Sequence, residues 1–251
     1  VPTAEGRSTP FGTIVLLHGL TASPTETKPL GRLLQQAGFN VFVPRLAGHT
    51  GSLEDLRTTE RWEWIRNVDQ AIAGAQKQFA GPLFLAGESL GAILSLLGAV
   101  RFPKSIAGLA LYAPPLALES VFSETVMKIA SHLPDLIENR LPTVPKRSRP
   151  ENYLAEKREA LPVHSIAAAG RMASIRRMVF RNLSKVTAPI LIIEDPYDHH
   201  LGPGAWDELL IEVAAPVDTV LVPGGEHELI LGHRLAAVAA ATTQFFKRLS
   251  A

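Results

Sequence analysis

Short apolar runs alternate with amphipathic stretches along most of this chain. Continuous apolar runs of this length are typical of parallel strands that are covered on both faces. They predict strands at residues 13–17, 40–44, 83–86, 106–112, 190–193 and 219–222. Apolar residues recur at helical spacing over 30–37, 62–79 and 234–249. Strands that alternate with helices in this way predict an α/β fold with a mostly parallel central sheet and helices on both faces.

The segment 114–186 breaks this alternation and contains no pattern typical of a strand. Apolar residues recur at helical spacing over 120–133, where we expect the stripe to face a pocket rather than a partner chain, and a proline-rich stretch follows. The simplest account is a helical cap, 114–186, inserted into a core formed by 1–113 and 187–251. Twelve basic and seven acidic residues give the cap a net charge of +5. We interpret them as a solvated outer face, the alternative being attraction of an anionic substrate.

The composition of the chain limits the classes of partner that it can bind. The chain has 251 residues, a formal charge of +1 and 20% charged residues, so it lacks a basic field for nucleic acid, and a small-molecule substrate fits better. Without cysteine it forms neither disulfides nor thiolate metal sites. No run of 18 or more apolar residues occurs, so no membrane insertion is expected. We expect a cytoplasmic location, with secretion left open because the chain begins at Val1 without a methionine.

The candidate chemistry centres on Gly87-Glu88-Ser89-Leu90-Gly91, which follows one apolar run and opens another with helical character. A serine between glycines at a strand-to-helix corner is typical of a nucleophile elbow. The backbone crowds itself at so tight a corner, and glycines remove the side chains that would clash. The pattern alone is a weak signal, so its context decides.

A serine hydroxyl is a poor nucleophile at neutral pH and needs a base that is itself oriented by an acid. His227 has the best setting for the base, on a loop just after the last predicted strand, whereas His233 lies nearer the final helix. Asp198 is the preferred acid because a few loop residues separate it from the preceding strand. Asp195 is the alternative, but it lies close enough to the strand to order the turn instead.

Attack on a carbonyl places negative charge on its oxygen, which two backbone N–H groups must stabilise. Leu90 follows the serine and supplies one of them, and Leu20, after the first strand, is our candidate for the other. We expect His18 to hydrogen-bond this loop rather than to act as a second base.

Four further residues near the predicted site could have more than one role. Adjacent histidines on an extended stretch point to opposite sides, so we interpret His199 and His200 as solvated loop residues, and we expect no metal and no cofactor. Glu88 either contacts surrounding loops or lies near the pocket and affects His227, and Glu226 raises the same question.

The motifs Leu16-Leu17-His18-Gly19-Leu20-Thr21 and Pro44-Arg45-Leu46-Ala47-Gly48-His49, with the elbow, resemble those of the α/β-hydrolase superfamily. Within it the chain is similar to bacterial carboxylesterases and monoacylglycerol lipases. The resemblance implies that Ser89 is the nucleophile, with Asp198, His227 and the N–H groups of Leu20 and Leu90 in the roles given above. It also implies that the second motif is a structural turn and that the cap shapes an acyl or alcohol site.

Three positions depart from the pattern of that group. Asp195 stands where glycine is common, Thr50 follows His49 where glycine is common, and Glu226 precedes His227 where a small residue is usual. These departures do not change the predicted catalytic residues, but they affect the prediction of the substrate.

The leading hypothesis is a serine hydrolase of short to medium carboxylic esters, monoacylglycerol-like esters included, that acts through an acyl-enzyme. The same residues also serve enzymes that act on amides, carbamates or carbon–carbon bonds, or that transfer the acyl group to an alcohol. A non-catalytic ligand-binding protein on this fold is a further alternative. It is expected to lose at least one of Ser89, Asp198 and His227, and this chain keeps all three.

Overall fold

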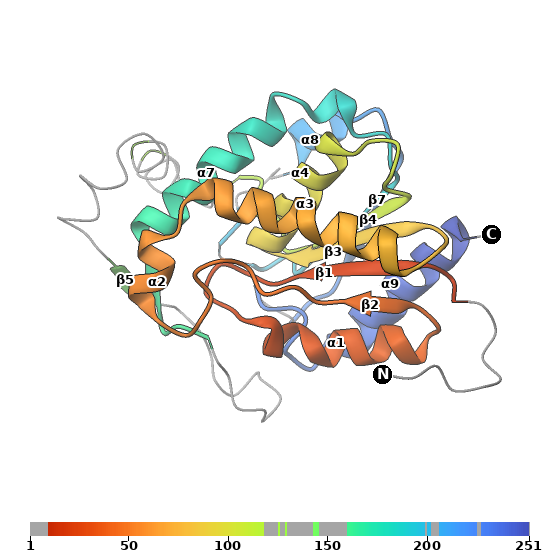
Figure 1. Ribbon diagram of the computed structural model, residues 1–251, viewed down its shortest axis with the longest axis horizontal. Coiled ribbons are helices and arrows are strands. Elements are labelled where there is room, and N and C mark those ends of the chain that lie inside the picture. The colour runs from red at the N-terminus through yellow and green to blue at the C-terminus, as the bar shows by residue number, and fades with distance from the viewer. Residues whose placement is uncertain are drawn as a thin grey trace.

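A six-stranded sheet forms the centre of the molecule (Figure 1). The computed structural model describes residues 10–117, 143–145, 160–198, 200–201, 206–224 and 227–250, together with Thr125 and Ile129. The strands are β1 (Thr13–Leu17), β2 (Asn40–Phe42), β3 (Leu83–Glu88), β4 (Gly108–Tyr112), β7 (Ile190–Glu194) and β8 (Val217–Leu221). They pair in parallel in the order β2-β1-β3-β4-β7-β8, which confirms the predicted α/β fold.

Each face of the sheet has its own apolar core. Ile14 and Leu16 of β1 pack in one cluster, and Val15 and Leu17 pack in the other. Successive side chains of a strand point to opposite faces, so a strand covered on both sides must be apolar at every position. This requirement explains why continuous apolar runs predicted these strands.

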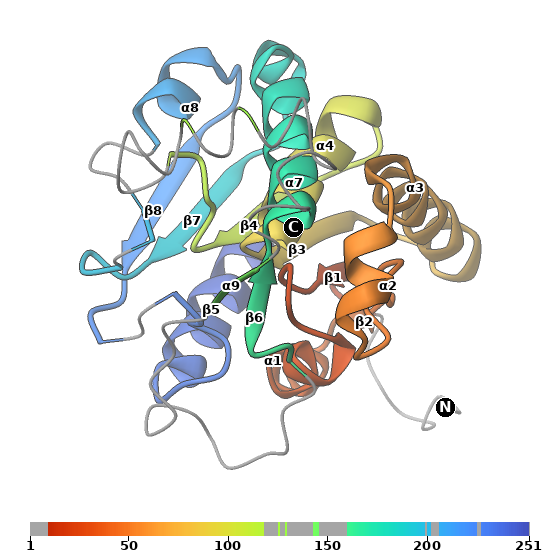
Figure 2. The same cartoon turned by 90° about the vertical axis from the view of Figure 1, so that its left-hand side faces the viewer.

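Helices cover both faces of the sheet (Figures 1 and 2). Side chains of α1 (Pro24–Gln36) and α9 (Leu235–Leu249) join the cluster on one face. Those of α3 (Arg61–Gln78), α4 (Leu90–Arg101) and α7 (Ile166–Phe180) join the cluster on the other, with Leu209 of α8 (Asp207–Glu212). The short helices α2 (Leu53–Thr58) and α8 were not predicted, because six residues are too few to establish a helical period.

Strand bounds differ from the prediction by one or two residues at several ends, including the start of β4, the end of β7 and the end of β8. β2 stops at Phe42, short of Pro44, which has no N–H for the ladder. β3 continues to Glu88, which is in register with Tyr112 of β4. β8 begins at Val217 rather than at residue 219, and as the edge strand it lacks the continuous burial that marks the inner strands.

Within 114–186 the expectation of no strand is wrong. β5 (Thr143–Pro145) and β6 (Val163–Ser165) pair antiparallel as a separate two-stranded sheet. Strands of three residues give too short a run for period-two alternation to show. The helix predicted at 120–133 lies outside the described residues except for Thr125 and Ile129, and the division of the chain into core and cap stays a prediction.

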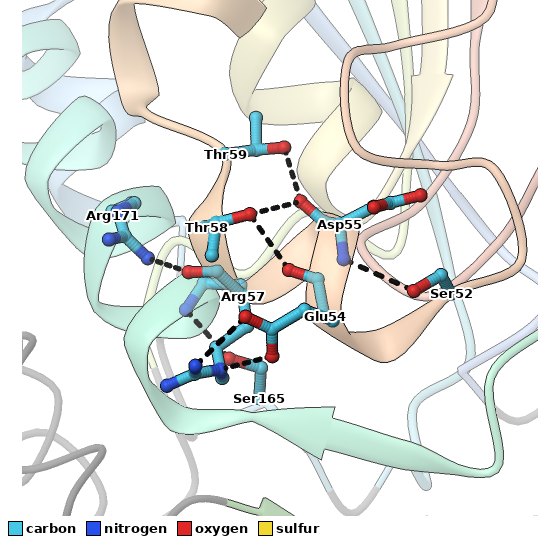
Figure 3. Close-up of polar contacts among 9 residues, drawn as sticks. Ser52, Glu54, Asp55, Arg57, Thr58, Thr59, Ser165 and Arg171 are labelled. Atoms are coloured by element: carbon cyan, nitrogen blue, oxygen red, sulfur yellow. Dashed lines mark hydrogen bonds and ion pairs between the residues drawn. The ribbon is translucent and has the colours of Figure 1, made fainter.

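α7 is anchored to the core by polar contacts as well as by packing (Figure 3). The buried Arg171 donates from Nη1 to the carbonyl oxygen of Arg57 at the end of α2 (2.8 Å), and its Nη2 lies 3.4 Å from Oε1 of Glu60. Arg61 of α3 donates to the hydroxyl of Ser174 (2.8 Å). Because apolar side chains of α7 also pack in the same core cluster as α4, this helix is fixed on the sheet layer.

Candidate active site

Ser89 lies at the sharp turn between β3 and α4. Its backbone has φ 54° and ψ −114°, a conformation that non-glycine residues rarely adopt. A Cβ on Gly87 would overlap the backbone of Gly91, and a Cβ on Gly91 would overlap the carbonyl group of Leu17. The Ser89 N–H donates to the carbonyl oxygen of Tyr112 (3.0 Å), which holds the turn against β4. The half-buried serine is therefore held at the carboxyl edge of the sheet in a strained turn.

His227 and Asp198 reach the same edge on loops that follow β8 and β7. Parallel strands end together, so the loops after them converge on Ser89. His227 Nε2 lies 3.1 Å from Ser89 Oγ, and His227 Nδ1 lies 2.7 Å from Asp198 Oδ2. With the proton on Nδ1, the ring donates to the carboxylate and accepts from the hydroxyl. The structure thus brings the predicted nucleophile, base and acid into one line of hydrogen bonds.

Asp198 is buried under this line, at 8% exposure. Burial raises the pKa of a carboxyl, but here the hydrogen bonds from His200 and His227, with the charge that His227 can carry, outweigh burial and hold the pKa of Asp198 well below its ordinary value. The carboxylate is therefore ionised at neutral pH and is suited to stabilise a positive imidazolium.

The loop after β1, which carries Leu20, lies beside the elbow. A Cβ on Gly19 would lie 3.8 Å from the Cβ of Ser89, so the loop runs close to the serine. Leu90 is the first residue of α4, where amide N–H groups have no partner inside the helix. Across the described residues, the amides of Leu20 and Leu90 join none of the backbone hydrogen bonds of loops and caps.

Two buried histidines hold that loop in place. His18 Nε2 accepts from the N–H of Leu46 (3.2 Å), which places the ring proton on Nδ1, 3.0 Å from the carbonyl oxygen of Gly19. His49 Nε2 lies 2.8 Å from the carbonyl oxygen of Leu20. Burial, with the neighbouring His49, lowers the pKa of His18 to about 3. The prediction that His18 hydrogen-bonds the loop is confirmed.

A family model described as serine aminopeptidase, S33, matches residues 8–233. The chain belongs to the serine aminopeptidase S33 family. A thermostable monoacylglycerol lipase of Bacillus sp. strain H-257 is 26% identical over 194 residues, which cover 77% of this chain and 73% of that one. The human monoglyceride lipase is 27% identical over 228 residues, covering 85% and 73%. A carboxylesterase of Bacillus subtilis is 23% identical over 193 residues, covering 75% and 73%.

Solved structures share the fold of this S33 family member. A metagenome-derived lipolytic enzyme superposes with a TM-score of 0.82 at 21% identity, over 96% of this chain and 95% of that one. The monoacylglycerol lipase of Paleococcus ferrophilus superposes with a TM-score of 0.74 at 19% identity, over 96% of each chain. The comparisons confirm the predicted α/β-hydrolase fold.

Glu88 accepts a hydrogen bond from the N–H of Ile230 (3.2 Å), and its carboxylate is buried. Ile230 lies three residues after His227, so Glu88 connects the elbow to the loop that carries the candidate base. Of the two roles left open for Glu88, contact with a surrounding loop is the one observed. Glu226 lies outside the described residues.

Three acidic side chains lie at the end of β7 and in the loop that follows it. Asp195 Oδ1 accepts from the N–H of Tyr197 (2.9 Å), which confirms that Asp195 orders the turn. Burial, with the charge of Asp198 nearby, raises the pKa of Glu194 to about 7. Among these three acids, the hydrogen bond to the His227 ring is made by Asp198.

His200 is solvated, as interpreted, with a side chain that is 41% exposed, but it also contacts Asp198 and His227, which the interpretation did not include. Its N–H donates to Asp198 Oδ1 (2.8 Å), its Nδ1 lies 3.1 Å from the same oxygen, and its ring centroid lies 4.7 Å from that of His227. The spacing Asp-x-His is a usable signal, because an aspartate in a turn commonly accepts from the N–H two residues on. His199 lies outside the described residues, and His233, the weaker candidate base, is exposed on the turn before α9.

Across the described residues, no helix combines the length and the apolar character needed to cross a membrane.

Proposed function

We propose that this protein hydrolyses carboxylic esters with Ser89 as nucleophile, His227 as general base and Asp198 as the acid that orients it. The line of hydrogen bonds from the Ser89 hydroxyl through His227 to Asp198, at 3.1 and 2.7 Å, is the observation that supports this most directly. A serine so placed has a base for its proton, and the base has a buried carboxylate for the charge it gains.

Each step follows from that line. His227 Nε2 takes the proton of Ser89 as Oγ attacks the ester carbonyl carbon, and the ester C=O becomes a tetrahedral oxyanion. The imidazolium then gives this proton to the departing alkoxide, which leaves an acyl-enzyme and a free alcohol. Water, deprotonated by His227, attacks the acyl-enzyme in the same way and releases the carboxylic acid and Ser89.

The amides of Leu20 and Leu90 are the proposed donors to the oxyanion. Leu90 contributes the unpartnered N–H of a helix start, where the helix dipole also favours negative charge. His49 lies 2.8 Å from the Leu20 carbonyl oxygen, a contact that fixes the orientation of this peptide group. Loss of one such donor costs about 10²–10³ in kcat in a comparable enzyme.

The proposed substrates are short to medium acyl esters, monoacylglycerol-like esters among them. Relatives named monoacylglycerol lipase and carboxylesterase support this range. The proposed cap, 114–186, supplies the acyl or alcohol pocket, and the cytoplasmic location stays a prediction from sequence.

Covalent labelling tests the assignment of the nucleophile. A fluorophosphonate probe is expected to add one label per chain, at Ser89 in a peptide map, and Ser89→Ala to remove both the label and about 10⁵–10⁶ of kcat. Ser95→Ala is the matched control, because the Ser95 hydroxyl is bound to the Gly91 carbonyl within α4 (2.8 Å). A label at another residue, or retained activity in Ser89→Ala, overturns the proposal.

A substrate panel tests the bond and the chain length. Turnover of p-nitrophenyl esters of increasing length and of 1-monoacylglycerols is compared with that of amino-acid anilides and carbamates. We expect esters to be preferred and the rate to peak at short or medium acyl chains. Preference for anilides would instead match the aminopeptidase named in the family description.

A further inference from the structure

Asp198 carries an imidazole on each of its two carboxylate oxygens. His227 Nδ1 lies 2.7 Å from Oδ2, and His200 Nδ1 lies 3.1 Å from Oδ1. One donor atom from each of the three side chains lies within 4.8 Å of the others. The two rings lie side by side, with their centroids 4.7 Å apart. The proposed relay moves protons between Ser89 and His227 over Asp198, so the ring of His200 takes no part in the proton transfer.

These three donors match the ligand chemistry of zinc. Zn²⁺ takes imidazole nitrogen and carboxylate oxygen at about 2.0–2.2 Å, so neighbouring ligands of a tetrahedral site lie about 3.3 Å apart. The Oδ1–Nδ1 spacing of 3.1 Å already meets this requirement. Two histidines, one carboxylate and a water form the ligand set of open zinc sites. The set also joins a buried carboxylate to a His200 side chain that is 41% exposed, which gives a metal ion access from solvent.

We infer that Asp198, His200 and His227 form a zinc site, and that its occupation stops the ester hydrolysis proposed above. In the active relay the ring proton of His227 is on Nδ1 and the lone pair of Nε2 faces Ser89. A zinc ion bound to Nδ1 moves that proton to Nε2, since a neutral imidazole carries one N–H. His227 then has no lone pair for the serine proton. The ion also occupies the carboxylate that orients the ring.

His200 is the residue that makes this site more than an ordinary acid–base pair. Without its ring, Asp198 and His227 alone offer two donors, too few for firm zinc binding. The N–H of residue 200 donates to Asp198 Oδ1 (2.8 Å) from the backbone, so His200→Ala keeps this bond. The substitution therefore removes a zinc ligand and leaves the acid held in place. His233→Ala removes an exposed histidine outside the cluster and is the matched control.

Zinc inhibition of the full chain is measured after metal has been stripped with EDTA and the chelator removed. Micromolar Zn²⁺ is expected to stop p-nitrophenyl ester hydrolysis, with full recovery on adding EDTA. Mg²⁺ and Ca²⁺ are expected to have no effect, because they prefer oxygen ligands. His200→Ala is expected to need about 100-fold more Zn²⁺ for half inhibition, relative to its own metal-free rate, and His233→Ala to behave as wild type. Equal inhibition of wild type and His200→Ala overturns the inference.

Zinc binding is measured separately from activity by competition with a chromophoric zinc chelator. One ion per chain is expected for wild type and for the inactive Ser89→Ala, and none of comparable affinity for His200→Ala. Binding by Ser89→Ala does not depend on the reaction, so a failed hydrolase assignment and a failed zinc site give different results. Unchanged stoichiometry and affinity in His200→Ala refute the site even if zinc inhibits the enzyme by another route.

Discussion

The buried His18 predicts a specific loss of stability in mild acid. Its Nε2 accepts a backbone hydrogen bond (3.2 Å), and its ring is fully buried. Burial lowers its pKa from 6.5 to about 3, so the native state excludes a proton that the unfolded chain binds. The histidine therefore contributes its full stability above pH 6.5, and that contribution is lost as the pH falls toward 3.

The size of the effect follows from linkage. Between pH 7.5 and 5.0 the unfolded histidine takes up most of one proton and the native one takes up almost none. Integrated over this range, the free energy of unfolding falls by about 2 kcal/mol because of His18 alone. Glu194, whose pKa is raised to about 7, has the opposite sign, because its native state binds more protons than the unfolded chain. The dependence of wild-type stability on pH is therefore the sum of contributions from several titrating groups.

The measurement is a difference between wild type and His18→Gln. Gln keeps an acceptor oxygen near the position of Nε2 but does not titrate. Urea unfolding, followed by tryptophan fluorescence, to which the fully buried Trp64 contributes, is compared at pH 7.5 and 5.0 for both proteins. We expect wild type to lose about 2 kcal/mol more than the variant, with unchanged dependence on urea. A difference below about 0.5 kcal/mol refutes the reasoning, because His18 would then titrate alike in both states.

Two further predictions test the elbow and its neighbour. Gly91→Ala places a Cβ against the Leu17 carbonyl and should prevent native folding. Gly74→Ala, in open space within α3, should instead stabilise the folded protein by about 0.5–1 kcal/mol. Thermal unfolding of both variants measures these opposite effects of the same substitution. Glu88→Ala leaves the Ile230 N–H without its carboxylate acceptor and should lower kcat about 10–100-fold with little change in KM. Glu88→Gln keeps an acceptor oxygen and should recover most of that loss; equal kcat in wild type and Glu88→Ala would show that the contact does not position the histidine loop.

The inner strands were predictable because burial on both faces leaves a continuous apolar run. β1 has the predicted bounds, whereas the edge strand β8 is displaced by two residues at its start, because only one of its edges is paired. β5 and β6 were missed since three residues carry too little pattern. The sequence therefore predicts the elements that are long enough to show a regular pattern of buried apolar residues.

Within the site, the residues that perform chemistry were easier to predict than those that support them. Ser89 directly follows β3, and His227 lies on the loop after β8, so the sheet topology brings both to the same edge. The contact between Glu88 and Ile230 joins residues 142 positions apart, and no local pattern connects them. His200 was missed because its role depends on the ring of His227 as well as on the neighbouring Asp198.

The acidic side chains of the elbow, of the end of β7 and of the loop that follows it differ in charge and in partners, and this difference explains why Asp198 serves the proposed base His227. Glu88 and Asp195 are also buried, but each accepts from a backbone N–H of a loop. Glu194 is buried with a pKa of about 7, so at neutral pH it is partly uncharged. Asp198 thus combines ionisation at neutral pH with direct contact to the ring. The negative charge beside the imidazolium therefore comes from Asp198, whereas Glu88 and Asp195 hold their loops through backbone N–H groups.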